Sequence, residues 1–273
     1  MPEITANDVA LHYTDTGGDG RPVVLIHGWP LSGAAWSEQV PALSDAGYRV
    51  LTYDRRGFGD SAKPEGGYDY DTFAADLAGL LDGLGLTDAS LVGFSMGGGE
   101  IARYIGQHGT GRLHSAVFAG AVPPYLLKTD DNPDGGLEDS DVQGMEEGAR
   151  TDRVNFLDGF TTNFFTAGDD LKVTEEQRQE AIALQQPARD EALVGCIDAF
   201  ARTDFRDDLT KVDIPTLVIH GDADAIVPFE VSGRRTAEAI PGSTLVVVPG
   251  APHGFNVSHA GEFNKALLEF LAR

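Results

Sequence analysis

The stretch at residues 91–98, LVGFSMGG, decides how the rest of the chain is interpreted. An apolar strand pattern runs directly into Gly-x-Ser-x-Gly, and a helical pattern follows at once. This context predicts a nucleophile elbow, a turn so tight that its serine adopts a strained backbone conformation. The helix N-terminus behind the serine favours developing negative charge. Ser95 is therefore the candidate nucleophile; the alternative is a glycine-rich turn that holds a serine by chance.

A serine hydroxyl at neutral pH needs a general base beside it, and that base needs a carboxylate to orient it. His253 is the candidate base, because it follows the last predicted strand in a loop that glycines and prolines shape. His259, six residues further on, is the alternative. The histidines in edge-strand or helix-end contexts are interpreted as structural: His12, His108 and His114.

The carboxylate is expected at the end of an earlier strand, where residues 220–228 read HGDADAIVP. Asp224 is favoured, because it lies further into the loop and Ile226 and Val227 beside it would keep water away. Asp222 stays the alternative, since its side chain could instead cap the turn directly after the strand.

The negative charge that develops on a substrate oxygen needs two backbone N–H donors. The amide of Met96, directly after the serine, is one candidate. Residues 27–30, HGWP, follow an early strand and offer the amide of Trp29 as the second. Pro30 has no N–H but fixes the loop, and His27 is expected to hold the loop by hydrogen bonds.

Short apolar runs alternate with helical patterns along the chain, which predicts an α/β protein with a mostly parallel sheet. The predicted strands are residues 9–13, 22–27, 49–53, 89–93, 113–119, 216–220 and 244–248, and the predicted helices include 71–84, 98–107 and 262–272. The alternation stops between residues 123 and 209, which indicates a helical cap inserted into a core of residues 1–122 and 210–273. Cap and loop side chains are expected to line a substrate pocket: Phe160, Phe164, Phe200, Ile226 and Val227. The alternative is that the phenylalanines form only the cap's own core.

Composition excludes several classes of function. The 273 residues carry a formal net charge of −23, which would repel nucleic-acid phosphates and anionic lipids. Of the 43 acids 28 are Asp, a balance that fits salt adaptation and a GC-rich genome equally. No apolar stretch approaches the roughly 20 residues of a membrane helix. No signal-peptide pattern opens the chain and its single cysteine excludes an intrachain disulfide, so a cytoplasmic protein is expected.

The assembled motifs resemble the α/β-hydrolase fold superfamily over essentially the whole chain, and within it the cofactor-free haloperoxidase, perhydrolase and arylesterase group. The motifs are HGWPLSG at 27–33, YDRRGFGDS at 53–61, GFSMGGGE at 93–100, AVPP at 121–124, TDF at 203–205 and HGF at 253–255. The resemblance implies an eight-stranded sheet with a cap, a Ser95–Asp224–His253 triad, and oxyanion amides at Trp29 and Met96. Residues 54–59 resemble the family's structural turn, whereas the acidic run at 130–141 departs from the group.

By this resemblance the substrate is a small ester or lactone, and hydrogen peroxide can replace water to give a peracid that oxidises halide. Trp29-Pro30 resembles the members that favour this perhydrolysis. No metal cluster, dinucleotide motif or phosphate loop is recognised, so no metal and no cofactor are expected. Ser95 argues against a haloalkane dehalogenase or an epoxide hydrolase, which would need Asp there. A γ-lactamase, a carbon–carbon bond hydrolase, a cofactor-free dioxygenase and a small-ligand receptor stay as alternatives, and a homo-oligomer is left open.

Overall fold

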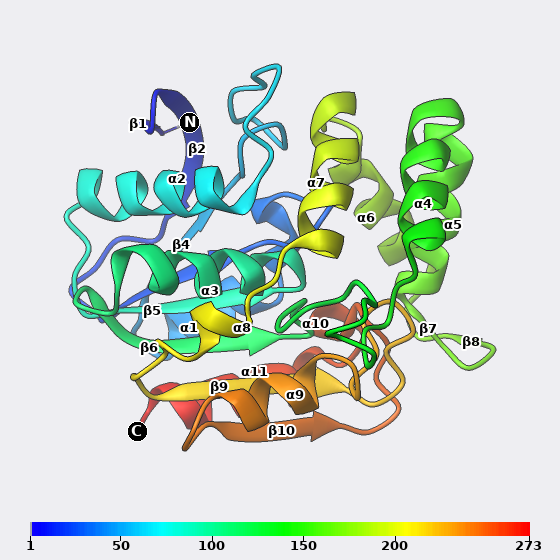
Figure 1. The fold of residues 1–273 in the computed structure, drawn as a ribbon. Helices are drawn as coiled ribbons and strands as arrows, with labels where there is room; N and C mark the ends of the chain where they lie inside the picture. Colours follow the sequence, from blue (N-terminus) through cyan, green and yellow to red (C-terminus); the bar gives the residue numbers. More distant parts are fainter. Residues whose placement is uncertain (1) are drawn as a thin grey trace.

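A central sheet with helices on both faces organises the computed structural model, which describes residues 2–273 (Figure 1). Within these residues the sheet has eight strands in the order β1-β2-β4-β3-β5-β6-β9-β10. The strands are β1 (Glu3–Ala6), β2 (Val9–Asp15), β3 (Pro22–Ile26), β4 (Arg49–Tyr53), β5 (Ala89–Phe94), β6 (Leu113–Ala119), β9 (Thr216–Gly221) and β10 (Thr244–Val248). All neighbours from β4 to β10 pair in parallel, while β2 pairs antiparallel with β1 and β4. The predicted mostly parallel eight-stranded sheet is confirmed.

The central strands are apolar throughout because both of their faces are covered. In β3, Val24 and Ile26 pack into the core on one face, whereas Val23 and Leu25 pack into the core on the other. The first core is shared with α2 (Tyr70–Gly83), α3 (Met96–His108) and α9 (Gly233–Ala239). The second is shared with η1 (Gly33–Trp36), α1 (Gln39–Asp45), α10 (Phe255–Ser258) and α11 (Ala260–Leu271). The predicted alternation of strands and helices thus closes two hydrophobic layers.

Helix α2 shows how local sequence sets these boundaries. Asp69 precedes the helix, and its side chain accepts a hydrogen bond from the Thr72 amide, which would otherwise lack a partner. The side chains of Phe73 and Leu77 are fully buried against the sheet. Gly85, at φ +63°, turns the chain away after the helix.

Strand β1 is absent from the predicted elements. Its four residues, Glu-Ile-Thr-Ala, alternate between polar and apolar, and a run this short carries only a weak strand signal. The turn to β2 places Asn7 and Asp8 at φ 47° and 62°. Hairpin turns of this kind need positive φ at both central residues, and Asn and Asp tolerate it best.

The segment between β6 and β9 contains α4 (Asp139–Thr151), α5 (Arg153–Phe164), α6 (Glu175–Gln185), α7 (Asp190–Arg202) and α8 (Arg206–Leu209). A short hairpin of β7 (Thr166–Ala167) and β8 (Asp170–Leu171) interrupts the helices, which the sequence pattern did not predict. Helices α4 to α7 stand beyond the ends to which the arrows of β6 and β10 point, whereas α8 lies beside α3 (Figure 1). We propose that residues 123–209 form a cap on a core of residues 1–122 and 210–273; Met1 lies outside the described residues.

A buried ion pair links the start of α3 to the loop after β4. The guanidinium of Arg55 donates from Nε to Glu100 at 2.8 Å, and the hydroxyl of Tyr53 also donates to this carboxylate. Both charged side chains are at most 1 % exposed. Burial raises the pKa of Glu100 despite the opposing effect of Arg55. The charged form of Glu100 is therefore stabilised by its contacts with Arg55 and Tyr53 and not by hydration.

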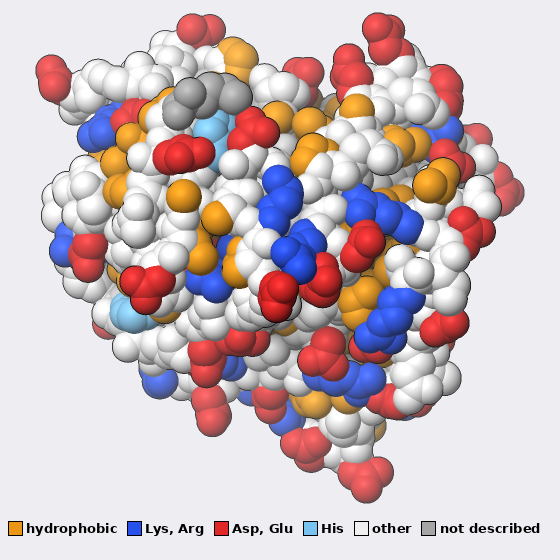
Figure 2. Space-filling model, turned by 90° about the horizontal axis from the view of Figure 1, so that it is seen from above, with side chains coloured by type: hydrophobic (Ala, Val, Ile, Leu, Met, Phe, Trp, Pro, Cys, Tyr) orange, Lys and Arg blue, Asp and Glu red, His pale blue; other side chains and the backbone are white. Residues whose placement is uncertain are grey.

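Acidic side chains are spread over the surface rather than gathered into one patch. Figure 2 shows them around the whole edge of one face, with Lys and Arg side chains between them. On this face the arrangement does not indicate a single anion- or cation-binding site. Among the described residues, no helix combines the length and the apolar character that a membrane span requires.

The Arg55–Glu100 pair leads to a prediction about stability. Glu100→Gln removes one charge and leaves the guanidinium of Arg55 buried and uncompensated. We expect the free energy of unfolding to fall by about 3–5 kcal/mol, measured by urea denaturation. Glu269→Gln, in the exposed pair with Lys265, is the matched control and should change it by less than about 1 kcal/mol. Equal losses in both variants would contradict the role of the buried pair.

Candidate active site

Ser95 lies between β5 and α3 in a backbone conformation that few residues adopt, with φ 54° and ψ −118°. A side chain at Gly93 would place its Cβ 2.4 Å from the carbonyl oxygen of Gly97, and one at Gly97 would lie 2.4 Å from that of Ile26. Only glycine fits at these two positions. The turn is fixed by the Ser95 amide, which donates to the carbonyl of Ala119 at 2.9 Å.

Three polar side chains from distant parts of the sequence form one continuous chain of hydrogen bonds. The Oγ of Ser95 lies 2.9 Å from Nε2 of His253, and Nδ1 of His253 lies 2.6 Å from Oδ2 of Asp224. A carboxylate only accepts hydrogen bonds, so Nδ1 carries the proton and Nε2 is free to accept from the hydroxyl. All three are at most 7 % exposed. The arrangement can transfer the serine proton to imidazole while the carboxylate orients the ring.

Asp224 stays charged although its side chain is fully buried. Burial alone would raise its pKa, but the electrostatic attraction of His253 and the hydrogen bonds from His220 and His253 hold the pKa of this carboxyl well below its usual range. Its other oxygen, Oδ1, accepts from the amides of Ile226 and Val227 at 2.9 and 2.8 Å. These donors replace the water that burial removes.

The alternatives for base and acid lie elsewhere. Asp222 is exposed, and its carboxylate accepts from the Gly250 amide at 2.6 Å, bracing the loop before His253. His259 bonds to the hydroxyl of its neighbour Ser258. The remaining predicted structural histidines contact side chains away from Ser95: His12 with Asp54, His108 with Tyr104, and His114 with Asp88.

Two backbone amides flank Ser95 without a hydrogen-bond partner among the described residues, those of Trp29 and Met96. Met96 opens α3, and the first amides of a helix have no intrahelical acceptor. The Trp29 loop approaches closely, since a Cβ at Gly28 would lie 3.1 Å from Cβ of Ser95. The pair can therefore donate to an oxygen bound at Ser95.

His27 holds this loop, in line with its predicted structural role. Its Nε2 accepts from the Arg55 amide at 3.0 Å, and its Nδ1 lies 2.8 Å from the carbonyl of Gly28. Burial, and then the positive charge of Arg55, hold the pKa of His27 well below its usual range. The ring is therefore neutral and ties the loop after β3 to the loop after β4.

A cavity of about 40 Å³ opens at Ser95 and is lined by apolar side chains from both the core and the cap. Four of the five residues expected at a pocket line it: Phe160, Phe200, Ile226 and Val227. Sequence reasoning missed Leu126, Leu137 and Met145, which also line it. Leu137 and Met145 lie in and after the acidic run, whose charges gave no signal that apolar side chains between them point inward.

Phe164, the fifth expected residue, does not line this cavity. Its ring packs edge-on against His253 at 5.0 Å and against Phe94 at 5.9 Å. It lies at the end of α5, where the Gly254 amide donates to its carbonyl at 2.8 Å. Phe164 thus covers the imidazole and does not face the Ser95 cavity.

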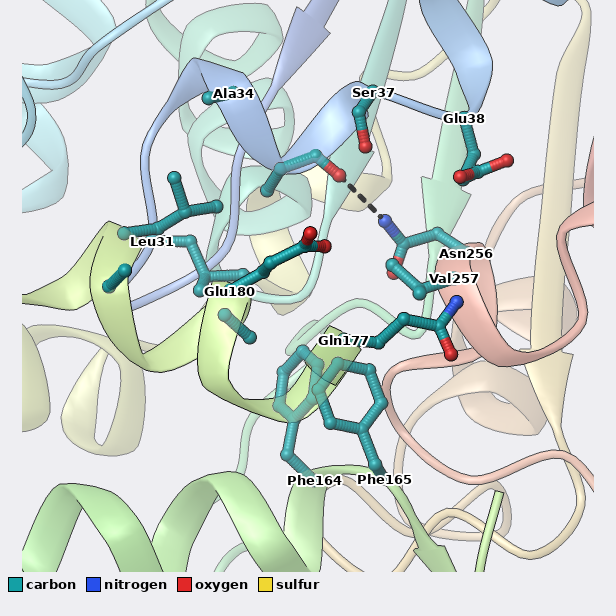
Figure 3. Close-up of a pocket in the computed structure, with 14 residues that line it drawn as sticks. Leu31, Ala34, Ser37, Glu38, Phe164, Phe165, Gln177, Glu180, Asn256 and Val257 are labelled. Carbon is teal, nitrogen blue, oxygen red and sulfur yellow. Dashed lines mark hydrogen bonds between the residues drawn. The ribbon is translucent and has the colours of Figure 1, made fainter. Parts of the chain in front are cut away.

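A larger pocket, of about 460 Å³, lies between α6 and η1 (Figure 3). Gln177 and Glu180 of α6 face Asn256 across it, while Phe164 and Phe165 form one wall. Ser95, His253 and Asp224 do not line it. The phenylalanine wall separates this pocket from the imidazole.

One group of side chains has metal-like spacing, formed by His12, Asp54 and Asp60, with potential ligand atoms within 4.8 Å of one another. Asp54 is already engaged as a hydrogen-bond acceptor. Its oxygens accept from the amides of Gly33 and Asp60, both at 2.8 Å, and from Nδ1 of His12 at 3.0 Å. These bonds explain residues 54–60 as a structural turn.

Comparison with known proteins shows similarity over the whole chain. A family model described as alpha/beta hydrolase fold matches residues 21–260. A non-heme chloroperoxidase of Kitasatospora aureofaciens is 48% identical, and a bifunctional esterase/perhydrolase of Acinetobacter calcoaceticus is 35% identical, each alignment covering 99% of both chains. The crystal structure of a bromoperoxidase from Bacillus anthracis superimposes with a TM-score of 0.97 at 53% identity, covering 100% of both chains.

The geometry of Ser95 predicts selective reactivity. A fluorophosphonate should form one covalent adduct, on Ser95, because its hydroxyl meets an imidazole that a carboxylate orients. Among the described residues the hydroxyl of Ser258 also meets an imidazole, that of His259, but no carboxylate contacts that ring. Ser61 is a matched control, since it is also buried but donates to the carbonyl of Asp54. Peptide mass spectrometry locates the adduct, which should be absent from His253→Ala. Labelling of Ser61 at a similar rate would contradict the assignment.

Proposed function

The chain belongs to the alpha/beta hydrolase family, and we propose that it is a serine hydrolase of small carboxylic esters or lactones that also catalyses perhydrolysis. The observation that carries the proposal is the continuous hydrogen-bond line from Ser95 through His253 to Asp224. The relatives support it, because their names describe halide oxidation without heme and, in one case, both esterase and perhydrolase activity.

In the proposed first step, the Oγ of Ser95 attacks the substrate carbonyl while Nε2 of His253 takes its proton. The amides of Trp29 and Met96 donate to the oxyanion, and Asp224 stabilises the imidazolium. His253 then gives its proton to the leaving alcohol. The result is an acyl ester of Ser95 and a free alcohol.

In the second step, water attacks the acyl ester while His253 takes a proton from it. His253 then returns this proton to the leaving Oγ of Ser95, which frees the serine and a carboxylic acid. Hydrogen peroxide can attack in place of water, which releases a peracid. The peracid then transfers one oxygen to bromide, giving carboxylate and hypobromous acid. These steps need no metal, because the peroxide supplies the oxidising equivalents.

The cavity supports small acyl groups as substrates. A single water needs about 10–15 Å³ of such space, and the cavity at Ser95 provides about 40 Å³. Apart from Ser95 and the backbone, its lining is apolar or aromatic. We therefore propose an uncharged, short acyl group, for which p-nitrophenyl acetate is the first probe.

The proposed triad predicts which of three variants lose kcat and which one keeps it. Ser95→Ala and Asp224→Asn should each lower kcat for p-nitrophenyl acetate by about 10³-fold or more, through loss of the nucleophile or of the correct imidazole tautomer. Asp222→Asn is the matched control on the same loop and should keep kcat within about threefold of the wild type. Near-normal turnover by Ser95→Ala, or equal losses in the two Asp variants, would overturn the assignment.

If the protein catalyses perhydrolysis, bromination should require three reagents at the same time. Wild-type protein should brominate an organic acceptor only when acetate, hydrogen peroxide and bromide are all present, measured as loss of acceptor absorbance. Ser95→Ala should show only the background rate, since no acyl-enzyme forms. Bromination that persists without acetate or in Ser95→Ala would contradict a peracid route, and rapid ester turnover without any bromination would restrict the function to an esterase.

A further inference from the structure

A second histidine contacts the carboxylate of Asp224. His220 is the fifth residue of β9, four residues before Asp224, and is fully buried. Its Nε2 lies 2.8 Å from the carbonyl oxygen of Val227 and 3.2 Å from Oδ2 of Asp224. Oδ2 is the oxygen that also accepts from His253.

The surroundings fix the protonation of this ring. Both neighbours of Nε2 are acceptors, so Nε2 carries the proton, with the Val227 carbonyl as the nearer acceptor at 2.8 Å and Oδ2 of Asp224 as the more distant one at 3.2 Å. Nδ1 is buried without a hydrogen-bond partner among the described residues. It faces the backbone of α9, since a Cβ at Gly233 would lie 2.5 Å from it. A proton on Nδ1 would be buried without an acceptor, so the ring is held in its neutral form.

The contacts of His220 close a ring around the acid loop. Val227 donates its amide to Oδ1 of Asp224 and accepts at its carbonyl from His220, whose Nε2 also meets Oδ2. Both carboxylate oxygens are therefore held by contacts other than the one with His253. These contacts fix the orientation of the carboxylate plane. They also affect how much of its negative charge lies close to His253.

We propose that His220 is a positioning residue that orients Asp224 and draws part of its negative charge away from His253. The inference rests on the proposed function, in which His253 must be neutral to accept the serine proton. A neutral N–H donor at Oδ2 weakens the attraction between the carboxylate and a protonated imidazole. His220 thereby keeps His253 available as a base at lower pH than an unassisted Asp–His pair.

Other charged groups lie too far away or too exposed to take this role. Phe229 packs on His220 with ring centroids 5.8 Å apart, and beyond it lie Arg234 and Glu230, an exposed ion pair. Asp222 is exposed at the end of β9. From the remaining neighbouring elements, uncharged residues face the Asp224–His253 pair: Phe94 from β5, Gly120 after β6 and Phe164 from the cap.

The test is the pH dependence of ester hydrolysis by His220→Leu and His220→Gln. Leu removes the donor, whereas Gln can return an N–H close to the position of Nε2. In His220→Leu the acidic limb of the kcat/KM profile should move to higher pH by about half a unit or more. Its kcat should fall about 10-fold or more with little change in KM, because the imidazole is misdirected. His220→Gln should restore most of the limb position and the rate.

His12→Leu is the matched control, because it also removes a buried histidine bonded to an aspartate, but at Asp54. It should lower stability without moving the limb. If His220→Leu does not fold, His220→Asn replaces it, since its shorter amide cannot reach Oδ2. Two results would overturn the inference and leave His220 only a packing role. One is a folded His220→Leu or His220→Asn whose acidic limb stays at the wild-type pH, and the other is a His220→Gln profile that matches the variant without a donor.

A second readout needs no substrate and separates this inference from the proposed function. In protein labelled with 15N-histidine, the ring signals of His253 should titrate at higher pH in His220→Leu than in the wild type. If the wild type hydrolyses no ester but the His253 signals still titrate at higher pH in His220→Leu, the result would support the role of His220 and reject the esterase function. Wild-type turnover that Ser95→Ala abolishes, with no change in this titration, would reject only the role of His220.

Discussion

The backbone at Ser95 is the constraint on which the candidate site depends. A non-glycine residue in this region of φ and ψ costs about 1–3 kcal/mol and persists only where its surroundings enforce it. Here β5 and α3 enforce it, because Gly93 and Gly97 let the two elements approach to distances that any side chain would prevent. The strain fixes the direction of Oγ, so the other groups need only be brought to one predetermined point.

Those groups arrive from loops at the carboxyl ends of neighbouring strands, the edge at which ligands of open α/β sheets bind. Each loop is stabilised by a polar contact separate from the proposed chemistry. His27 ties the Trp29 loop to Arg55, Asp54 gathers the turn after β4, and Asp222 supports the loop that leads to His253. Asp222, which the sequence left as the alternative acid, therefore has a structural role, as His27 was predicted to have.

The cap and the core are connected through aromatic packing and a few backbone bonds. The indole of Trp29 donates to the carbonyl of Leu193 in α7, and its ring packs against Phe160 at 5.0 Å and Phe200 at 5.6 Å. The residue that we propose as an oxyanion donor is thus also part of the pocket wall. Changes in the cap can reach the donor geometry through this one side chain, which links the shape of the pocket to the proposed catalysis.

The sequence by itself determined the elements whose information is local: the apolar strands, three helices to within two residues at each end, and the glycine spacing that specifies the Ser95 turn. It also indicated the order of serine, acid and base, because parallel strands bring successive loops to one edge. It favoured Asp224 as the acid but kept Asp222 as the alternative. That choice depends on which carboxylate is buried against an imidazole 29 residues away. Only the tertiary structure decided it, as it decided that Phe164 covers His253, that Leu137 and Met145 turn inward, and that His220 meets the same carboxylate. Such contacts join residues whose separation in the chain carries no periodic signal, so they follow from packing and not from pattern.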